Sequence, residues 1–246
     1  MTENRTIEML AEWNGKVPTR IFVDESLRIL RAASEAKVAL KMLSGLAIKV
    51  HSLNEKEFAN RLGRSAEKGQ EYSDIDFATY YKLKAANHPI SFRDRLEVDP
   101  ISIPLSDLLL EKLQIVSFSR KDMIDTLLLL KAHTIAGKEE LETISTDRVA
   151  YVLSRDWGFW YTVTTNLQGI GEHVKEMSVL SSQEASDLSS KVEKLLYAAN
   201  TVPKSLRWKL RAIIGSRKKW YKPVETEETV GEFGIWRLRE QASTSG

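Results

Sequence analysis

The chain has 246 residues, of which 42% are hydrophobic and 28% are charged. This length suits one large domain or two small ones, and the composition excludes a disordered chain. A net charge of +2 permits nucleic-acid binding without requiring it, and the lack of cysteine excludes disulfide scaffolds, thiolate zinc sites and cysteine nucleophiles. The sequence shows neither a run of roughly 18 apolar residues, as in a membrane span, nor a secretory signal, so we expect a cytoplasmic protein.

The pattern along the chain predicts four parts. Residues 1–23 are expected to form an N-terminal arm, and residues 24–103 mix strand-like and helix-like segments in one core. Residues 104–222 have helical spacing of apolar positions almost throughout, and residues 223–246, acidic and then Ser/Thr-rich, are expected to form a flexible tail. The predicted fold class is therefore α+β, a small mixed sheet with flanking helices followed by a helical C-terminal region.

The first candidate site lies where a strand meets a helix. The segment 38–44 reads as a buried strand, and the segment 45–51 reads as the start of a helix. The free N–H groups of a helix N-terminus bind phosphate; Ser44 adds a hydroxyl donor, and Gly45 allows close approach of a ligand. A Ser-Gly pair is also common in ordinary turns.

The second candidate site is Asp74-Ile75-Asp76. Read as a strand, this segment places both carboxylates on one face, where their repulsion is relieved by a cation such as Mg²⁺. The simpler interpretation is an exposed edge strand or turn that carries two acids. The polar loop 61–70, which precedes the pair, is expected to be mobile until a ligand orders it.

Helix signals follow from Pro104 onward. Ser119 and Asp122 have capping-box spacing, helices are predicted to begin near Thr146 and after Ser181, and the latter should run to about Ala199. Four charged residues on the two helices after the sheet either form a solvated face or contribute to a binding site: Lys112, Lys121, Asp122 and Asp125. Asp122 could equally serve only as a helix cap.

These segments together resemble the DNA polymerase β-type nucleotidyltransferase superfamily, near its abortive-infection toxin-like branch. The resemblance covers about residues 26–174 and rests on the Ser44-Gly45 joint, the Asp74-Ile75-Asp76 pair and the segments 103–115, 120–125 and 156–164. It implies transfer of a nucleoside monophosphate from an NTP to an RNA acceptor, such as tRNA, or to a protein acceptor. It also implies a toxin with an antitoxin partner.

The resemblance assigns roles to individual residues. Asp74 and Asp76 would hold Mg²⁺ and act as the catalytic carboxylates, and Ser44 and Gly45 would hold a phosphate. The nucleotide site would be completed by charged residues of the two following helices, namely Lys112, Lys121, Asp122 and Asp125.

The chain departs from the family pattern in two ways. Gly45 and Asp74 are 29 residues apart, which implies an inserted loop, and the strand that carries a third acid is missing between Tyr81 and His88. We therefore expect a truncated sheet with an open edge beside Asp76, and weak or absent turnover because two carboxylates hold the metal less rigidly than three. The alternative is that Asp94 or Asp99 acts as a substitute ligand. The alternative function is a catalytically degenerate homologue that binds nucleotide, nucleic acid or protein.

Two further groups of residues are candidates for a structural or a binding role. The four histidines show no metal-binding spacing, and Trp157 and Trp160 are expected to pack in the core. The segment 204–221 interleaves aromatics with basic residues and suits an RNA backbone, an anionic membrane surface or simply a solvated helix face. Its basic residues are Lys204, Arg207, Lys209, Arg211, Arg217, Lys218 and Lys219.

Overall fold

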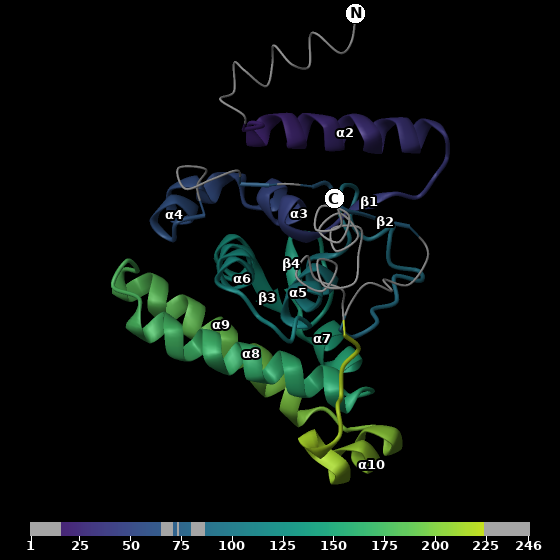
Figure 1. Cartoon of the computed structure of the whole chain (residues 1–246), viewed down its shortest axis with the longest axis vertical. Coiled ribbons are helices and arrows are strands. Elements are labelled where there is room, and N and C mark those ends of the chain that lie inside the picture. The colour runs from purple at the N-terminus through teal and green to yellow at the C-terminus, as the bar shows by residue number, and fades with distance from the viewer. Residues whose placement is uncertain (1–15, 65–70, 73, 80–86, 224–246) are drawn as a thin grey trace, which may run out of the picture.

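A computed structural model describes residues 16–64, 71–72, 74–79 and 87–223, and its fold is α+β (Figure 1). Its helices are α2 (Thr19–Glu35), α3 (Ser44–His51), α4 (Lys56–Arg61), α5 (Leu105–Leu113), α6 (Arg120–Ala132), α7 (Thr146–Leu153), α8 (Trp157–Glu176), α9 (Ser182–Thr201) and α10 (Leu206–Ile214). Single 3-10 turns are η1 (Leu53–Glu55) and η3 (Gly215–Arg217). The strands are β1 (Lys41–Met42), β2 (Phe77–Ala78), β3 (Thr134–Ala136) and β4 (Thr143–Ser145).

The first sheet is small and centres on Met42. β1 runs antiparallel to β2, with Met42 opposite Phe77, and on its other side Met42 forms a parallel bridge with Ser102. The strand predicted over 38–44 is therefore shorter than expected. The Leu43 N–H still donates to the Asp76 carbonyl at 3.0 Å, so the backbone pairing continues up to the acidic pair, Asp74 and Asp76.

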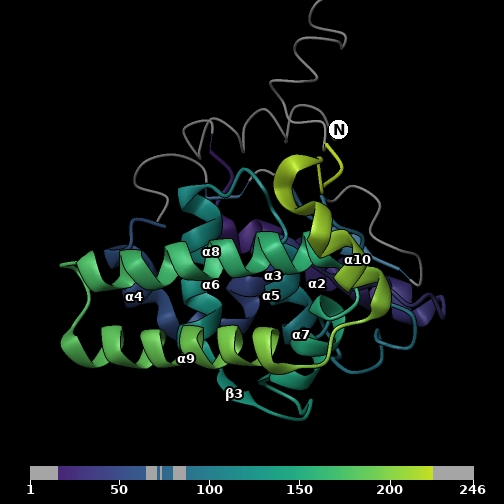
Figure 2. The ribbon, with the colours of Figure 1, turned by 90° about the horizontal axis from the view of Figure 1, so that it is seen from below.

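Helix α5 forms the centre of the core. All nine of its residues are buried, which follows from its run of leucines and from the helices that surround it (Figures 1 and 2). A helix buried on every side must also satisfy its polar residues. Asp107, for example, accepts from Arg95 at 2.7 Å and from Arg148 at 2.6 Å.

The remaining helices cover this core from two sides. α2 packs on β1 and α3 at one side, and the long pair α8 and α9 lies across the opposite side (Figure 1). Seen from below, α8 and α9 run side by side over α6 (Figure 2). α2 runs through the boundary between residues 23 and 24, so the last part of the predicted arm belongs to a helix that packs on the core.

The predicted helix starts are confirmed. Ser119 and Asp122 form a reciprocal capping box on α6, Ser181 and Glu184 form another on α9, and the Ser145 hydroxyl caps α7. The parallel pair β3 and β4 was not predicted, since both strands have only three residues and lie in a helical region. The described part of the chain contains no helix that is long and apolar enough to cross a membrane.

Candidate functional site

The N-terminus of α3 is the centre of the candidate site. Ser44 has a φ of +63°, a left-handed conformation that is uncommon for a residue with a side chain. A Cβ atom added at Gly45 would lie 3.2 Å from Asp125 Oδ2 and 3.3 Å from both Arg64 Nη2 and a carbon of the Tyr72 ring. Gly45 is therefore closely surrounded by charged groups, and even a methyl group at this position would require its neighbours to shift.

Two of the polar atoms around Gly45 lack hydrogen-bond partners. Asp125 Oδ2 and Arg64 Nη2 are both buried, and the described residues supply neither with a hydrogen bond. Asp125 Oδ2 still has an ion pair with Lys112 at 3.4 Å, whereas Arg64 Nη2 is a buried donor that an anionic ligand could satisfy.

The acidic pair lies at this helix terminus, just before β2 rather than within a strand. Asp76 is half-buried and its side chain hydrogen-bonds Ser44, whereas Asp74 is exposed. Burial, and then the negative charge of Asp74, raise the pKa of Asp76 above its usual value, against the opposing effects of Ser44, Lys112 and Lys121. The two carboxylates are thus close enough to repel each other, as the pattern predicted.

Lys112 connects the pair to α6. Its Nζ atom lies 3.5 Å from Ser44 Oγ, 3.4 Å from Asp125 Oδ2 and 3.5 Å from Asp122 Oδ1. Burial alone would lower the pKa of Lys112, but Glu111, Asp125 and Asp122 together raise it, so the ammonium group is held charged. The interpretation of Lys112 and Asp125 as a solvated face is wrong, because both are buried.

Asp122 and Lys121 have less central positions. Asp122 forms the capping box of α6, as one of its two predicted roles required, and it also lies 3.5 Å from Lys112 Nζ. Lys121 is exposed, and its charge acts on Asp76 from the rim of the site.

Arg64 was missed by the sequence analysis, which placed it in a polar loop. It follows α4 directly, is buried, and donates to Asp125 Oδ1 at 2.7 Å and to the Glu71 carbonyl at 2.9 Å. Its guanidinium also lies 4.7 Å from the centre of the Tyr72 ring. The remainder of the predicted loop, residues 65–70, lies outside the described residues.

Glu111 was also missed. Burial raises its pKa to about 7, the positive charge of Lys112 opposes this shift, and the negative charge of Asp76 adds to it. Its Oε2 atom is buried and has no hydrogen bond from the described part of the chain. The sequence signal was a charged residue inside the leucine run of α5.

The two proposed substitute acids do not join this site. Asp99 accepts from the backbone of Ile101 and Ser102 at 2.8 and 2.7 Å and lies beside His51, at the far end of α3 and about 10 Å from Ser44. Asp94 lies in an exposed turn with a φ of +57°. The gap beside Asp76 that was predicted to leave an open edge falls mostly in residues 80–86, outside the described ranges.

The basic residues of the segment 204–221 fall into two groups. Lys204 donates to the Ala199 carbonyl, and Arg211 donates to the Gly215 and Lys218 carbonyls at 2.6 Å each, so these two serve the local fold. The remaining five basic residues are exposed: Arg207, Lys209, Arg217, Lys218 and Lys219.

The tryptophans of this segment face inward. Trp208 packs edge-on against Trp160 at 5.1 Å, and Trp220 Nε1 donates to Thr162 at 3.0 Å. They hold α10 and the following chain against α8 rather than offering free faces for bases. Trp157 is buried and stacks on Tyr161, which confirms core packing for this residue.

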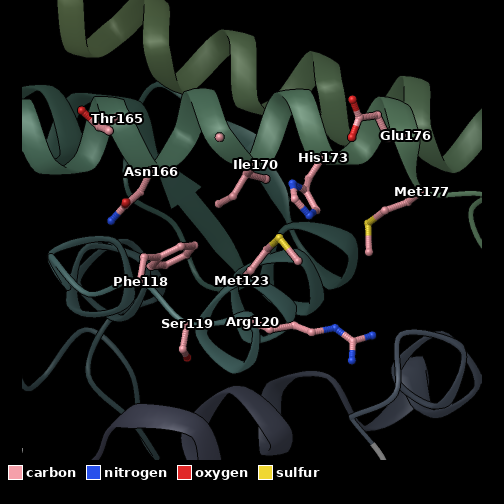
Figure 3. Close-up of a pocket in the computed structure, with 11 residues that line it drawn as sticks. Phe118, Ser119, Arg120, Met123, Thr165, Asn166, Ile170, His173, Glu176 and Met177 are labelled. Carbon is pink, nitrogen blue, oxygen red and sulfur yellow. The ribbon is translucent and has the colours of Figure 1, made fainter.

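A cavity of about 590 Å³ opens between the start of α6 and the middle of α8 (Figure 3). Its walls are apolar on both sides, with Phe118 and Met123 facing Ile170, while Arg120 and His173 lie nearer its rim (Figure 3). A second cavity, of about 690 Å³, lies between α7 and α9. Neither cavity is lined by Ser44, Asp74 or Asp76.

Comparisons with models of protein families, with characterised proteins and with solved structures find no match to this chain. The chemistry of the site therefore rests on its own geometry. It combines a helix N-terminus and buried cations, which suit an anion, with two close carboxylates, which suit a divalent cation.

Proposed function

We propose that the chain is a nucleotidyltransferase that transfers a nucleoside monophosphate from an NTP, as its Mg²⁺ complex, to a hydroxyl of an RNA or protein acceptor and releases pyrophosphate. The observation that carries this proposal is the convergence at the N-terminus of α3. Asp76 and Lys112 are 36 residues apart in the chain and Asp125 lies 13 residues further on, yet all three contact Ser44 or lie close to Gly45.

The anionic end of the substrate would bind at Gly45. The α3 N-terminus offers N–H groups, and Ser44 offers its hydroxyl to a phosphate oxygen. Arg64 Nη2, buried and without a hydrogen bond from the described residues, also lies close to Gly45. A phosphate there would receive charge-assisted hydrogen bonds and would remove the cost of that unpaired atom.

The acidic pair fits a magnesium ion. The charge of Asp74 contributes to the raised pKa of Asp76, and a divalent cation between the two carboxylates would relieve that repulsion. When bound, the ion would neutralise charge that develops on the phosphates. Lys112 would act from the other side, where Asp122 and Asp125 hold its ammonium group in place.

The second candidate is a degenerate homologue that binds nucleotide without turnover. The ion pairs of Lys112 favour it, since two carboxylates already offset much of the charge that the lysine would otherwise offer to a phosphate. An antitoxin partner and tRNA as acceptor remain parts of the proposal that rest on the resemblance alone.

The test is incubation of the full chain with labelled NTPs, Mg²⁺ and total RNA, in parallel with thermal unfolding in Mg²⁺-NTP. We expect label transfer in the wild type and a higher melting temperature, because a ligand that binds only the folded state stabilises it. Asp76→Ala should abolish both the transfer and the Mg²⁺-dependent part of the shift while the protein stays folded.

The outcomes separate the two candidates. A melting shift without label transfer would favour the degenerate homologue. If millimolar Mg²⁺-NTP gives no shift with the wild type, the assignment of the site to nucleotide is wrong.

A further inference from the structure

A second polar cluster lies at the opposite end of α3 from the proposed nucleotide site. His51 is the last residue of α3, His133 directly follows α6, and Glu142 ends the loop between β3 and β4. Each of the three offers a ligand atom, and these atoms all lie within 4.8 Å of one another. The histidine spacing in the sequence gave no sign of this, because 82 residues separate the two rings.

The two distances from the imidazole rings to the Glu142 carboxylate are close to the separation of neighbouring ligands of one metal ion. His133 Nδ1 lies 3.2 Å from Glu142 Oε2, and His51 Nδ1 lies 3.5 Å from Glu142 Oε1. Nitrogen and oxygen ligands about 2.0–2.1 Å from a tetrahedral zinc ion are about 3.3 Å apart. The rings meet edge to face with their centres 5.7 Å apart, which leaves both able to face the carboxylate.

The hydrogen bonds around His51 determine which of its nitrogens carries a proton. The Ser102 hydroxyl donates its single hydrogen to the Ile103 carbonyl at 2.6 Å. Ser102 Oγ must therefore accept from His51 Nε2, 2.9 Å away. In the neutral ring, Nδ1 then presents its lone pair to the Glu142 carboxylate 3.5 Å away, an arrangement that a cation between the two atoms, either a proton or a metal ion, stabilises.

His133 is the second imidazole of the cluster, and the residue is only 4% exposed. Its Nδ1 atom lies 3.2 Å from Glu142 Oε2 and is the nitrogen that could bind an ion there. Its Nε2 atom is buried with no hydrogen bond from the described chain, and an ion bound through Nδ1 would leave that atom unchanged.

The charges nearby favour a divalent cation. Asp99 Oδ2 lies 3.8 Å from His51 Nε2, behind the ring, as an outer carboxylate does for a metal-bound histidine. Glu142 and Asp99 together balance a charge of +2. Lys191, whose charge also reaches His133, pairs with Asp187 at 2.9 Å. A small cavity of about 10 Å³ borders Asp99 and Glu142 and has room for about one water molecule.

We propose that His51, His133 and Glu142 bind a divalent transition-metal ion, best matched by Zn²⁺, with water as a fourth ligand. The ion would join the ends of α3 and α6, the two helices whose opposite ends carry Gly45 and Asp125. The bound ion would stabilise the fold. The proposal of this metal site does not depend on the proposed transferase activity. Mixed nitrogen and oxygen ligands distinguish it from a Mg²⁺ site, which takes oxygen.

The test uses the metal alone with the tag-free full chain. Zn²⁺ should bind with a stoichiometry of one and raise the melting temperature by about 5–10 °C at a hundredfold excess over its Kd. Co²⁺ in its place should give the intense visible absorption of a four-coordinate site. Mg²⁺ without nucleotide should give neither response.

Matched variants localise the response. His133→Gln and Glu142→Gln should each weaken Zn²⁺ binding at least tenfold, and Glu142, exposed in its loop, offers a variant that still folds if the buried histidine variant does not. His173→Gln, an exposed histidine of α8, is the control and should bind as the wild type does. The proposal is overturned if Zn²⁺ produces no shift in the wild type. It is equally overturned if Glu142→Gln binds zinc as tightly as the control.

Discussion

At the scale of single residues, the candidate site is defined by charges that the fold buries. Asp125 is fully buried between Arg64 and Lys112, and Glu111 is buried beside the same lysine. Burial of a charged group costs free energy unless the group is paired and hydrogen-bonded. Buried charges are therefore uncommon in cores that serve only packing. Their concentration near Gly45 is the feature on which the proposed function rests.

Glu111 should make the stability of the protein depend on pH. Its pKa is about 7 in the folded protein and about 4.5 in the unfolded chain. The folded state then holds the proton more tightly, so stability falls as the pH rises from about 4.5 to 7. Glu111→Gln should remove that fall, a relative gain of about 3 kcal/mol between pH 5 and 8.

Urea unfolding of the wild type and the variant at both pH values measures this gain. The exposed Glu172→Gln serves as the control and should follow the wild type. Parallel pH profiles for Glu111→Gln and the wild type would show that Glu111 is ionised in the folded state throughout this range.

Arg64 should matter more for stability than its surface neighbour. Arg64→Ala leaves the buried Asp125 with Lys112 as its remaining ion-pair partner, which should cost about 2–4 kcal/mol. Arg61→Ala is the matched control, because Arg61 pairs with Glu184 at 2.6 Å but at the surface, and should cost much less. Chemical denaturation measures the free energy of unfolding of both variants. Equal losses of this free energy would contradict the central position given to Arg64.

At the scale of elements, the strand-to-helix joint places the site. β1 leads through Leu43 to Ser44, and the short pairing with β2 delivers Asp76 to the same point. α6, held by its capping box at Ser119, brings Asp125 over Gly45. Three elements therefore meet at one helix terminus, and they pack so closely at Gly45 that a Cβ atom there would be crowded.

Gly45→Ala tests this close packing directly. A methyl group there would lie within 3.2–3.3 Å of Asp125, Arg64 and Tyr72, so we expect a loss of about 1–2 kcal/mol and weaker Mg²⁺-NTP binding. Gly169→Ala in α8 is the control, because its Cβ would meet nothing within 4 Å. The control should gain up to about 1 kcal/mol from helix propensity. Thermal unfolding compares them, and a stabilised Gly45→Ala would show that Gly45 is not closely surrounded.

At the scale of the whole molecule, the basic surface lies apart from the proposed nucleotide site. α10 and the following turn lie at the lower end of Figure 1, while α3 lies in its upper half (Figure 1). α10 also exposes an apolar stripe, with Leu206 73% and Ile213 77% exposed. An RNA acceptor bound at this surface would have to extend across the molecule to reach Asp76.

Removal of the exposed charges tests this surface. Replacement of Arg217, Lys218 and Lys219 by Ala should weaken RNA binding. It should also reduce the slope of log affinity against log salt concentration by up to about 3 × 0.7 for a single strand. A triple variant with the same charge change elsewhere, at the exposed Lys138, Lys175 and Lys194, is the control. Filter binding across a salt series measures both. If the two triple variants lose the same affinity, the segment is an ordinary solvated face.

Local patterns in the amino-acid sequence predicted the Ser44-Gly45 joint, the acidic pair, the helical region and its caps. Each of these depends on neighbours within a few residues, through hydrogen bonds at helix ends or the alternation of apolar positions. Arg64, Glu111 and the pair of His51 and His133 could not be predicted in this way. Burial and contact between residues far apart in the chain decide whether a charge is solvated, paired or left without a partner, and those conditions exist only once the helices have packed.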